Sequence, residues 1–370
     1  MNDIDKIIQE KISTTVSSEL INRPIILDLS VDGDRKNLAK LFKEKKIDNV
    51  IDSYDTQIRE LNEVNNPSLI AHAPQKLDYK LKMDEGVWVY FDWKRTLVHL
   101  LKEKEYVRLR TSRNAYLITD NEQKKFADAK IGFAGLNVGN PGAICITLEG
   151  GSRFMKFADL DPLSVSNLNR FRAGICDLDL NKVTLSARQA YEIDPFIDIE
   201  IYDNGITPDN IDKFLLEPKL DLLIEEMDNL KLKLLIREKA KKYKIPVLMV
   251  TADGITDVER YDLEPDLHLL AGNLKQDVIT GINSIQPGKG TLRERVLLAR
   301  DFIGQELLSE RLNKAFLVIG TELPSIPQLS EWTFLRGAIL CHVARKIVTG
   351  EEVKSGRYIV DSDLIINTSR

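Results

Sequence analysis

The stretch ADLDPLSVSNLNR, residues 158–170, gathers side chains that together suit a nucleotide. Asp159 and Asp161 supply carboxylates that can accept hydrogen bonds from ribose hydroxyls. Asn167 and Arg170 can donate hydrogen bonds to phosphate oxygens, and the planar guanidinium of arginine suits two such oxygens at once. A solvated loop is the alternative interpretation, so the surrounding residues must decide between the two.

A glycine-rich segment, AGLNVGNPGA, lies upstream and follows an apolar run at residues 130–135. Its glycines are Gly135, Gly139 and Gly142. Asn137 stands where a dinucleotide-binding turn has its second glycine. A glycine-rich turn between a strand and a helix lets backbone N–H groups approach phosphate oxygens. We therefore expect a phosphate-binding turn, with Asp159 at the end of the next strand holding the ribose, whereas the alternative is a packing turn without a ligand.

Two cations and a further carboxylate occupy comparable positions at predicted strand and helix ends. Lys182 and Arg170 offer the positive charge that a polyphosphate needs as negative charge develops on it. Asp228 follows the apolar run 221–226, and a carboxylate beside phosphates at that sheet edge is a natural magnesium ligand. The structural alternatives are surface salt bridges or, for Asp228, a cap of the helix that begins near Leu230. Their shared position at strand ends favours phosphoryl-transfer chemistry.

The pattern around these residues predicts an α/β fold with a doubly wound, mainly parallel, Rossmann-like sheet. Apolar strands alternate with helix-length segments from Lys130 on, which is typical of a parallel sheet covered on both faces. The predicted strands are 130–135, 153–159, 197–203, 221–226 and 245–250, and the predicted helices are 140–149, 181–193, 208–216 and 229–243. Later elements are expected to be a strand within 259–266, a loop at 281–290, and helices at 291–309 and 329–349, the last ending at Gly350.

The chain is expected to comprise three segments. Residues 1–105 are predicted to form a mixed α/β accessory domain, with a strand at 24–30, a helix at 34–45 and an aromatic segment at 87–104. Residues 106–260 carry the predicted nucleotide site. Residues 261–370 are expected to complete the fold with a crossover segment and helices.

The composition excludes several classes of protein. The 370 residues carry a formal net charge of -5, so the composition does not indicate a broad surface that binds nucleic acid. No apolar run of about 18 residues and no apolar signal core occur, so we expect a cytoplasmic protein without a membrane segment. Cys145, Cys176 and Cys341 form no CxxC pair, and neither a disulfide framework nor a structural zinc site is expected.

In combination, these motifs resemble the ThiF/MoeB/E1 family of adenylyltransferases. The family's Asp-x-Asp strand end, which leads to Ser-Asn-Leu-x-Arg, is similar to residues 159–170. The remaining similar residues are Arg110 and Arg113 for an Arg-x-x-Arg motif, Lys182, and an Asp-Asn pair at Asp228 and Asn229. The likeness covers residues 106–260 and, more loosely, the helix at 329–349. It most resembles bacterial ThiF domains that occur alone or joined to nitroreductase-like domains.

The resemblance implies that ATP and magnesium bind and that AMP is transferred to a carboxylate, giving an acyl-adenylate and pyrophosphate. The implied nucleotide-binding residues are Gly135, Asn137, Gly139, Gly142, Asp159, Asp161 and Asn167. The implied catalytic residues are Arg170, Lys182, Asp228 and Arg113, with Asp228 on magnesium and Arg113 reaching the ATP of a second subunit in a homodimer. The implied substrate is the C-terminal carboxylate of a peptide or small protein.

Two departures from the family pattern bear on the reaction. Asn137 replaces the second glycine of the turn, and residues 251–340 contain no cysteine, so we expect no internal thioester. Two other functions stay open: a NAD- or FAD-dependent oxidoreductase that uses the same glycine turn, and a non-catalytic E1-like scaffold subunit. A tRNA-modifying adenylase is a weaker alternative because of the acidic charge balance.

Overall fold

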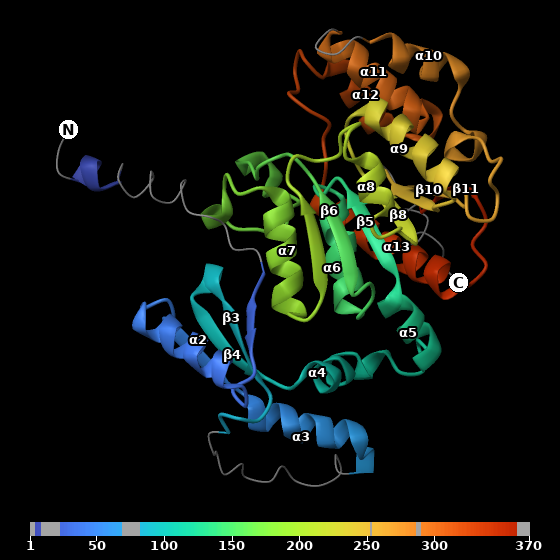
Figure 1. Ribbon diagram of the computed structural model, residues 1–370. Coiled ribbons are helices and arrows are strands. Elements are labelled where there is room, and N and C mark those ends of the chain that lie inside the picture. The colour runs from blue at the N-terminus through green and yellow to red at the C-terminus, as the bar shows by residue number, and fades with distance from the viewer. Residues whose placement is uncertain (1–3, 9–22, 69–81, 252–253, 286–289, 361–370) are drawn as a thin grey trace. The chain divides into compact units, whose positions relative to one another are not determined.

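The computed structural model describes residues 4–8, 23–68, 82–251, 254–285 and 290–360. The chain forms two compact units, Met1–Leu109 and Arg110–Arg370, and each is described by itself (Figure 1). Within the described ranges, no helix combines the length and the apolar character needed to cross a membrane.

The first unit is built on a four-stranded sheet in the order β1-β3-β4-β2. Its elements are β1 (Ile25–Leu27), α2 (Asp32–Lys43), β2 (Asn49–Asp52), α3 (Tyr54–Asn65), β3 (Val87–Phe91) and β4 (Thr96–Leu100), followed by α4 (Glu103–Arg110). The expected mixed α/β character is confirmed, and the aromatic segment forms the antiparallel pair of β3 and β4. His99 of β4 is fully buried, with its ring stacked between Tyr54 and Trp88 at centroid distances of 4.4 and 4.2 Å. Its Nδ1 lies 3.0 Å from the carboxylate of Asp52, so β4 is held to both α3 and β2.

The second unit is built on a seven-stranded sheet in the order β11-β10-β9-β8-β5-β6-β7. The strands are β5 (Lys130–Ala134), β6 (Phe154–Ala158), β7 (Asp198–Tyr202), β8 (Leu222–Glu225), β9 (Val247–Val250), β10 (Ile255–Glu259) and β11 (Gly356–Ile359). Strands β5 to β9 pair in parallel, and β10 and β11 add an antiparallel edge. The predicted doubly wound, mainly parallel sheet is therefore confirmed. The strand order reverses between β5 and β8, which is where such sheets place their ligand crevice.

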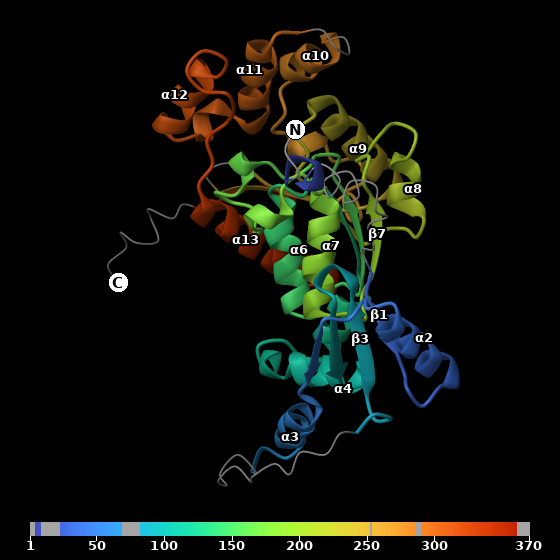
Figure 2. The same ribbon diagram turned by 90° about the vertical axis from the view of Figure 1, so that its left-hand side faces the viewer.

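Helices cover both faces of this sheet (Figures 1 and 2). The helices of the second unit are α5 (Asp120–Asp128), α6 (Gly139–Leu148), α7 (Lys182–Ile193), α8 (Ile211–Leu216), α9 (Leu230–Tyr243), α10 (Gln276–Ser284), α11 (Leu292–Ile303), α12 (Glu310–Val318) and α13 (Ser330–Thr349). A Cβ added at Gly132 of β5 would meet Phe214 of α8, whereas the next residue, Phe133, lies against Gly139 of α6. Because successive strand residues face opposite sides, α6 and α8 lie on opposite faces of the sheet. α6 packs between α7 and α13.

Several elements differ from the sequence-based expectations. A strand was expected within 259–266, but residues 260–266 lie in turns and loop, and the strand β10 covers Ile255–Glu259 instead. The expected loop at 281–290 begins with the last residues of α10, and 286–289 lie outside the described residues. The helix expected at 291–309 ends at Ile303, since Gly304 adopts a φ of 103°. The helix expected at 329–349 is confirmed as α13, with Gly350 at its end at a φ of 90°.

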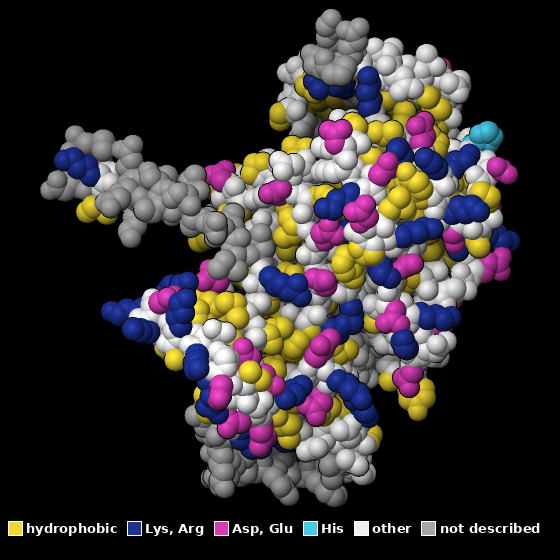
Figure 3. All heavy atoms as spheres, in the orientation of Figure 1, with side chains coloured by type: hydrophobic (Ala, Val, Ile, Leu, Met, Phe, Trp, Pro, Cys, Tyr) yellow, Lys and Arg dark blue, Asp and Glu magenta, His cyan; other side chains and the backbone are white. Residues whose placement is uncertain are grey.

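Charged side chains of both signs are mixed on the molecular face shown in Figure 3. Lys and Arg groups there alternate with Asp and Glu groups, and apolar side chains lie between them. On this face, charges of neither sign gather into one large patch.

Helices α6 and α13 pack so closely that two glycines are required between them. A Cβ added at Gly142 would lie 2.9 Å from the side chain of Leu340, and one added at Gly337 would lie 2.5 Å from Pro141. Real Cβ atoms do not approach other atoms so closely, so any larger residue would push the two helices apart. Gly142 therefore has a role in helix packing, and its expected role in phosphate binding stays a prediction.

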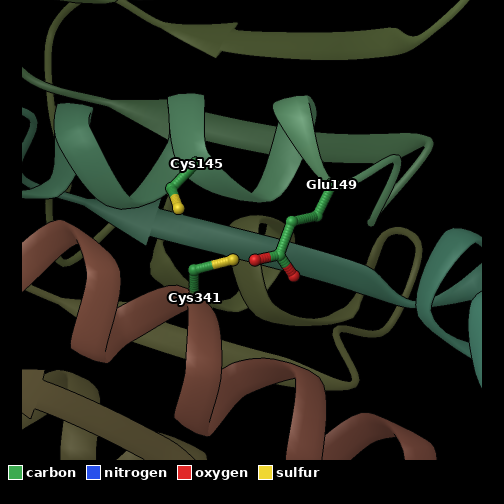
Figure 4. A group of neighbouring side chains, drawn as sticks. All are labelled: Cys145, Glu149 and Cys341. Atoms are coloured by element: carbon green, nitrogen blue, oxygen red, sulfur yellow. The ribbon is translucent and has the colours of Figure 1, made fainter. Parts of the chain in front are cut away.

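The same α6–α13 seam brings together two thiols and a carboxylate (Figure 4). The sulfur atoms of Cys145 and Cys341 and a carboxylate oxygen of Glu149 all lie within 4.8 Å of one another. A hydrogen bond with Cys145 and burial raise the pKa of the Cys341 thiol. Glu149 also lies 3.4 Å from Nε of Arg345. No sequence spacing marks this group, because its two thiols come from helices far apart in the chain.

Candidate functional site

The glycine turn after β5 packs against the end of β8. Gly135 has a φ of 94°, and a Cβ there would lie 2.5 Å from the carbonyl group of Glu226. The N–H of Gly135 donates to the carbonyl of Ala158 at 2.8 Å, and the N–H of Glu226 donates to that of Ala134 at 2.7 Å. Both the positive φ and the close approach favour glycine. The turn thus lies at the point where the strand order reverses.

Asp159, at the end of β6, ties this turn to the neighbouring strand. Its Oδ2 accepts a hydrogen bond from the N–H of Leu136 at 2.7 Å, and its Oδ1 accepts one from the N–H of Asp161 at 2.9 Å. Burial raises the pKa of Asp159. Each carboxylate oxygen can accept a further hydrogen bond, so the group can orient the turn and still accept bonds from ligand hydroxyls.

Lys182 is the first residue of α7, and its ammonium group lies at the same edge of the sheet. The side chain of Asn181 caps the helix by accepting a hydrogen bond from the N–H of Val183 at 2.8 Å. Lys182 itself is buried, and its Nζ lies 3.1 Å from Oδ2 of Asp161, whose side chain is 52% exposed. An exposed acid therefore neutralises a buried cation that a phosphate could approach.

Arg170 lies across from Asp228 in a partly buried position. Its Nη1 donates to the carbonyl of Ser166 at 2.9 Å and to the side chain of Asn169 at 2.8 Å. Its Nε is buried and has no hydrogen-bond partner among the described residues. Burial lowers the pKa of Arg170, and the charge of Asp228 opposes that shift. The unused Nε–H suits an oxygen atom of a ligand.

Asn167 has a local structural task. Its side-chain oxygen accepts hydrogen bonds from the N–H of Ser164 at 3.1 Å and from the hydroxyl of Ser164 at 3.0 Å. These bonds close the 3₁₀ turn Val165–Asn167 that leads to Arg170. Asn167 is buried, and its backbone carbonyl accepts a hydrogen bond from the N–H of Arg170 at 2.9 Å, so it helps to hold Arg170 in place, while its role in nucleotide binding stays a prediction.

Asp228 and Asn229, which follow β8, have different roles. The side chain of Asn229 caps α9 by accepting hydrogen bonds from the N–H groups of Lys231 at 3.1 Å and Leu232 at 3.2 Å. Asp228 is exposed, and among the described residues its carboxylate forms no hydrogen bond or ion pair. Desolvation by the surrounding protein nevertheless raises the pKa of Asp228. The helix cap is thus Asn229, and the alternative role of Asp228 as that cap is wrong.

A cavity of 440 Å³ opens beside these groups. Asn137, Arg170 and Asp228 line it, as expected of site residues, and the side-chain oxygen of Asn137 is buried without a hydrogen-bond partner among the described residues. Two buried charged residues in its wall, Lys233 and Arg336, were not among the residues predicted from the sequence. Neither carries a spacing signal, because each lies inside a helix and reaches the cavity only through the fold.

A buried network of ion pairs holds Lys233, one of the residues that line the cavity. Lys233 Nζ lies 3.1 Å from both carboxylate oxygens of Glu225, and Arg237 also pairs with Glu225. The Nε of Arg237 lies 2.9 Å from Glu259. Two acids and two bases thus balance their charges within the core, which is the condition for tolerating buried ions. The network joins β8, α9 and β10 into one rigid support.

Glu226, the residue after β8, lines the cavity as a buried acid. Its Oε1 accepts a hydrogen bond from the N–H of Val250 at 2.7 Å. Burial raises the pKa of Glu226 to about 8. Its carboxyl group is therefore largely protonated at neutral pH and adds little negative charge to the cavity.

The amino end of α6 offers backbone donors to the same edge. The N–H groups of Asn137 and Val138 donate to no other described residue. Gly139 has room for a Cβ, since the nearest atom, in Phe133, would be 3.7 Å away. Free amides at a helix N-terminus are suited to phosphate oxygens, and here they come from residues 137 and 138.

The arginine pair Arg110 and Arg113 lies at the other end of α6. Arg110 donates to the carbonyls of Thr147 and Leu148 at 2.8 and 3.1 Å, and its Nη2 pairs with Asp194 at 2.9 Å. Arg110 therefore holds the carboxyl end of α6 and is a structural residue.

Arg113 is exposed in the 3₁₀ turn Ser112–Asn114. Asn114 beside it donates to the carbonyl of Glu149 at 2.9 Å, just past the carboxyl end of α6. The glycine turn is at the opposite end of that helix, about 15 Å away at 1.5 Å per residue. The other residues that were assigned to the nucleotide and to catalysis lie toward the glycine-turn end of α6. Arg113 of the same chain lies at the opposite end of that helix. Tyr116 and Leu117, close to Arg113, are 103% and 84% exposed.

The ThiF family matches residues 111–256. The uncharacterized protein MT1398 of Mycobacterium tuberculosis (strain CDC 1551 / Oshkosh) is 34% identical over 278 residues, which are 74% of this chain and 38% of that protein. This chain thus spans well under half the length of the mycobacterial relative. The tRNA threonylcarbamoyladenosine dehydratase of Escherichia coli (strain K12) is 23% identical over 195 residues, 50% of this chain and 71% of that enzyme.

Two solved structures from E. coli are also similar. The dehydratase TcdA in complex with ATP has a TM-score of 0.47 and 20% sequence identity, covering 66% of this chain and 95% of that one. MccB with ATP has a TM-score of 0.43 and 12% identity, covering 66% and 63% of the two chains.

Proposed function

Residues 111–256 are a ThiF-family domain, and from this we propose that the protein is an ATP-dependent adenylyltransferase that transfers AMP to a substrate carboxylate and releases pyrophosphate. The observation that carries the proposal is the meeting of four side chains at one sheet edge: Asp159, Arg170, Lys182 and Asp228. Electrostatic influence of Lys182 on Asp228, and of Asp228 on Arg170, reflects how near these charges lie to one another. An oxidoreductase with the same glycine turn would leave the last three without a task.

In this proposal each group acts on a part of ATP that matches its chemistry. Asp159 accepts hydrogen bonds from the ribose hydroxyls, and the free amides of Asn137 and Val138 donate to phosphate oxygens. Arg170 and Lys182 neutralise the negative charge that develops as pyrophosphate leaves. Orientation of the carboxylate in line with the α-phosphate supplies the remaining acceleration.

Asp228 is suited to a magnesium ion, because its carboxylate is exposed at the cavity and unused by the protein. Asn229, the other half of the implied pair, uses its side-chain oxygen to cap α9 and is therefore not a ligand in this arrangement. Bound magnesium would neutralise phosphate charge and orient the leaving group.

We further propose that the active form is a homodimer in which Arg113 serves the partner's ATP. The support is that Arg113 lies at the far end of α6 from its own glycine turn, on a segment that exposes Tyr116 and Leu117. Large exposed apolar side chains beside an exposed cation are typical of an interface.

The proposed acceptor is a carboxylate of a peptide or small protein, and no covalent thioester follows, since residues 251–340 contain no cysteine. The related E. coli enzyme acts on tRNA according to its name. We propose no tRNA substrate for this protein, because its formal net charge of -5 does not favour binding to a polyanion.

The test is a thermal-unfolding comparison with MgATP, ATP with EDTA, NAD, NADPH and FAD. A ligand at about 100 times its Kd stabilises a fold by about 2.7 kcal/mol, which is a readable shift. We expect a magnesium-dependent shift with ATP that is lost in Arg170→Ala and Asp228→Ala. A shift with NAD or FAD alone would replace the proposal with redox chemistry, and no shift with any nucleotide would favour the scaffold function.

A further inference from the structure

The 440 Å³ cavity has two chemically different halves. Its polar half is lined by Asn137, Arg170 and Asp228, the groups assigned above to ATP and magnesium. The other half is formed by α11, α12 and the segment 319–328, and most of its lining residues are apolar, with Arg295, Ser325 and Gln328 as the polar exceptions. Its lining includes Val296, Ala299, Phe302, Phe316, Ile319 and Ile326.

The apolar half has no task in the binding of phosphates. Phosphate oxygens need hydrogen-bond donors and cations, and aliphatic and aromatic side chains supply neither. Phe302 and Phe316 are each 1% exposed, so they form fixed walls. The total volume is within the range of pockets that enclose small ligands, about 300–1,000 Å³. This half is therefore a preformed compartment for an apolar group.

The two halves meet where the reacting carboxylate must be. A carboxylate that attacks the α-phosphate has to lie beside Arg170 and Asp228, and whatever is attached to it extends away from the nucleotide. The apolar compartment opens from that point, since both halves belong to one continuous cavity. The group next to the carboxylate is thus the part of the substrate that contacts α11 and α12.

We propose that the substrate carboxylate is attached directly to a bulky apolar group, which the compartment between α11 and α12 selects. This inference rests on the proposed adenylation function. The shared chemistry fits two sources, a peptide that ends in a large apolar residue such as Leu or Phe, and a free aliphatic or aromatic acid. A chain that ends in glycine leaves the compartment empty and binds more weakly.

The experiment uses the full-length protein saturated with magnesium and α,β-methylene-ATP, which cannot be cleaved at the α-phosphate. Titration calorimetry then measures the Kd of straight-chain acids from acetate to octanoate, and of one peptide sequence ending in Gly, Leu or Phe. In the series that binds, we expect about fourfold tighter binding per added methylene, equivalent to about 0.8 kcal/mol, until the compartment is full. If the free acids show this increase in affinity, the substrate is a free acid, and if the peptides show it, the substrate is a peptide.

A pair of matched variants locates the effect. Ala299→Leu fills the compartment, whereas Ala315→Leu makes the same replacement at another half-buried alanine, on α12, which does not line the cavity. We expect Ala299→Leu to shift the preferred acid or C-terminal residue to a smaller one, and Ala315→Leu to leave the preference unchanged. Unchanged binding of the nucleotide analogue shows that both variants are folded.

The outcomes separate this inference from the function on which it rests. If the analogue binds but affinity does not grow with apolar size in either series, or if Ala299→Leu keeps the wild-type preference, the inference is wrong and adenylation still stands. If the analogue itself does not bind, the adenylation function is wrong, and the inference is lost with it.

Discussion

Asn229 caps helix α9 with its side chain, while Asp228, the residue before it, bonds to no other described residue. Two neighbouring polar residues thus have separate tasks, one in stability and the other, we propose, in magnesium binding. This separation makes the pair a sensitive test of the site.

Asp228→Asn keeps the size of the side chain and removes its charge. We expect the magnesium-dependent part of the ATP stabilisation to disappear and ATP–pyrophosphate exchange to fall about 100-fold or more, while the free energy of unfolding stays within about 0.5 kcal/mol of wild type. Asn229→Ala is the control, because loss of the cap costs about 1 kcal/mol of stability but leaves exchange near the wild-type rate. Equal loss of exchange in both variants would contradict the division of tasks.

Glu226 is expected to make stability depend on pH. Burial raises its pKa from 4.5 to about 8, so the folded state holds a proton that the unfolded state releases. The stabilisation is complete below pH 4.5 and is lost as pH rises through 8, and its size is on the order of a few kcal/mol. Glu226→Gln cannot ionise, so we expect it to gain stability relative to wild type between pH 6 and 9. Denaturant unfolding at pH 6 and at pH 9 measures the free energy of unfolding of both proteins. The same difference between Glu226→Gln and wild type at the two pH values would show that Glu226 does not titrate in this range.

Gly337→Ala is expected to destabilise the second unit. The new Cβ would lie 2.5 Å from Pro141, so α6 and α13 must separate at an overpacking cost of about 1–3 kcal/mol. Gly174→Ala is the matched control, since the nearest atom to its new Cβ, in Asp177, is 3.8 Å away. Thermal unfolding should show a loss for the first variant alone. Equal melting temperatures for Gly337→Ala and wild type would mean that the two helices adjust without cost.

Arg113 is expected to act in the partner's site. Arg113→Ala and Asp228→Asn should each be inactive as pure proteins, and mixing them after reversible dissociation should restore activity. A twofold-symmetric dimer of one variant with the other contains a single intact site, so an equal mixture should reach about a quarter of the wild-type exchange rate. No recovery, with mixed dimers demonstrated by mass spectrometry, would place Arg113 outside the partner's site.

The sequence was sufficient to predict the parallel sheet, because its central strands are largely buried and therefore mostly apolar, despite the buried charges of Lys156 and Glu225. It was not sufficient for β10, because Thr256, Asp257 and Glu259 make its sequence polar, and a strand was expected later in the chain, within 259–266. Those acids are buried because Arg357 and Arg237 pair with them. The sequence alone does not reveal such distant partners.

The same limit applies to the site. Asp159, Arg170 and Asp228 follow strands or their turns, and a parallel sheet brings such positions to one edge. The packing role of Gly142 was not predicted, since Leu340 lies against it from another part of the chain. The apolar compartment between α11 and α12 went unseen for a similar reason, because amphipathic helices do not reveal which of their faces stays open.

Helix α13 has a consequence for synthesis of the protein on the ribosome. The ThiF-matched residues end at 256, yet α6 within them packs against α13, which begins at Ser330. At 5–20 residues per second, the intervening residues take on the order of ten seconds to translate, and the apolar side of α6 stays uncovered for that time. The nascent chain therefore passes through a stage that chaperones can recognise. A gene fragment cut after residue 256 would encode a polypeptide held at that stage, so expression of this domain requires the sequence through α13.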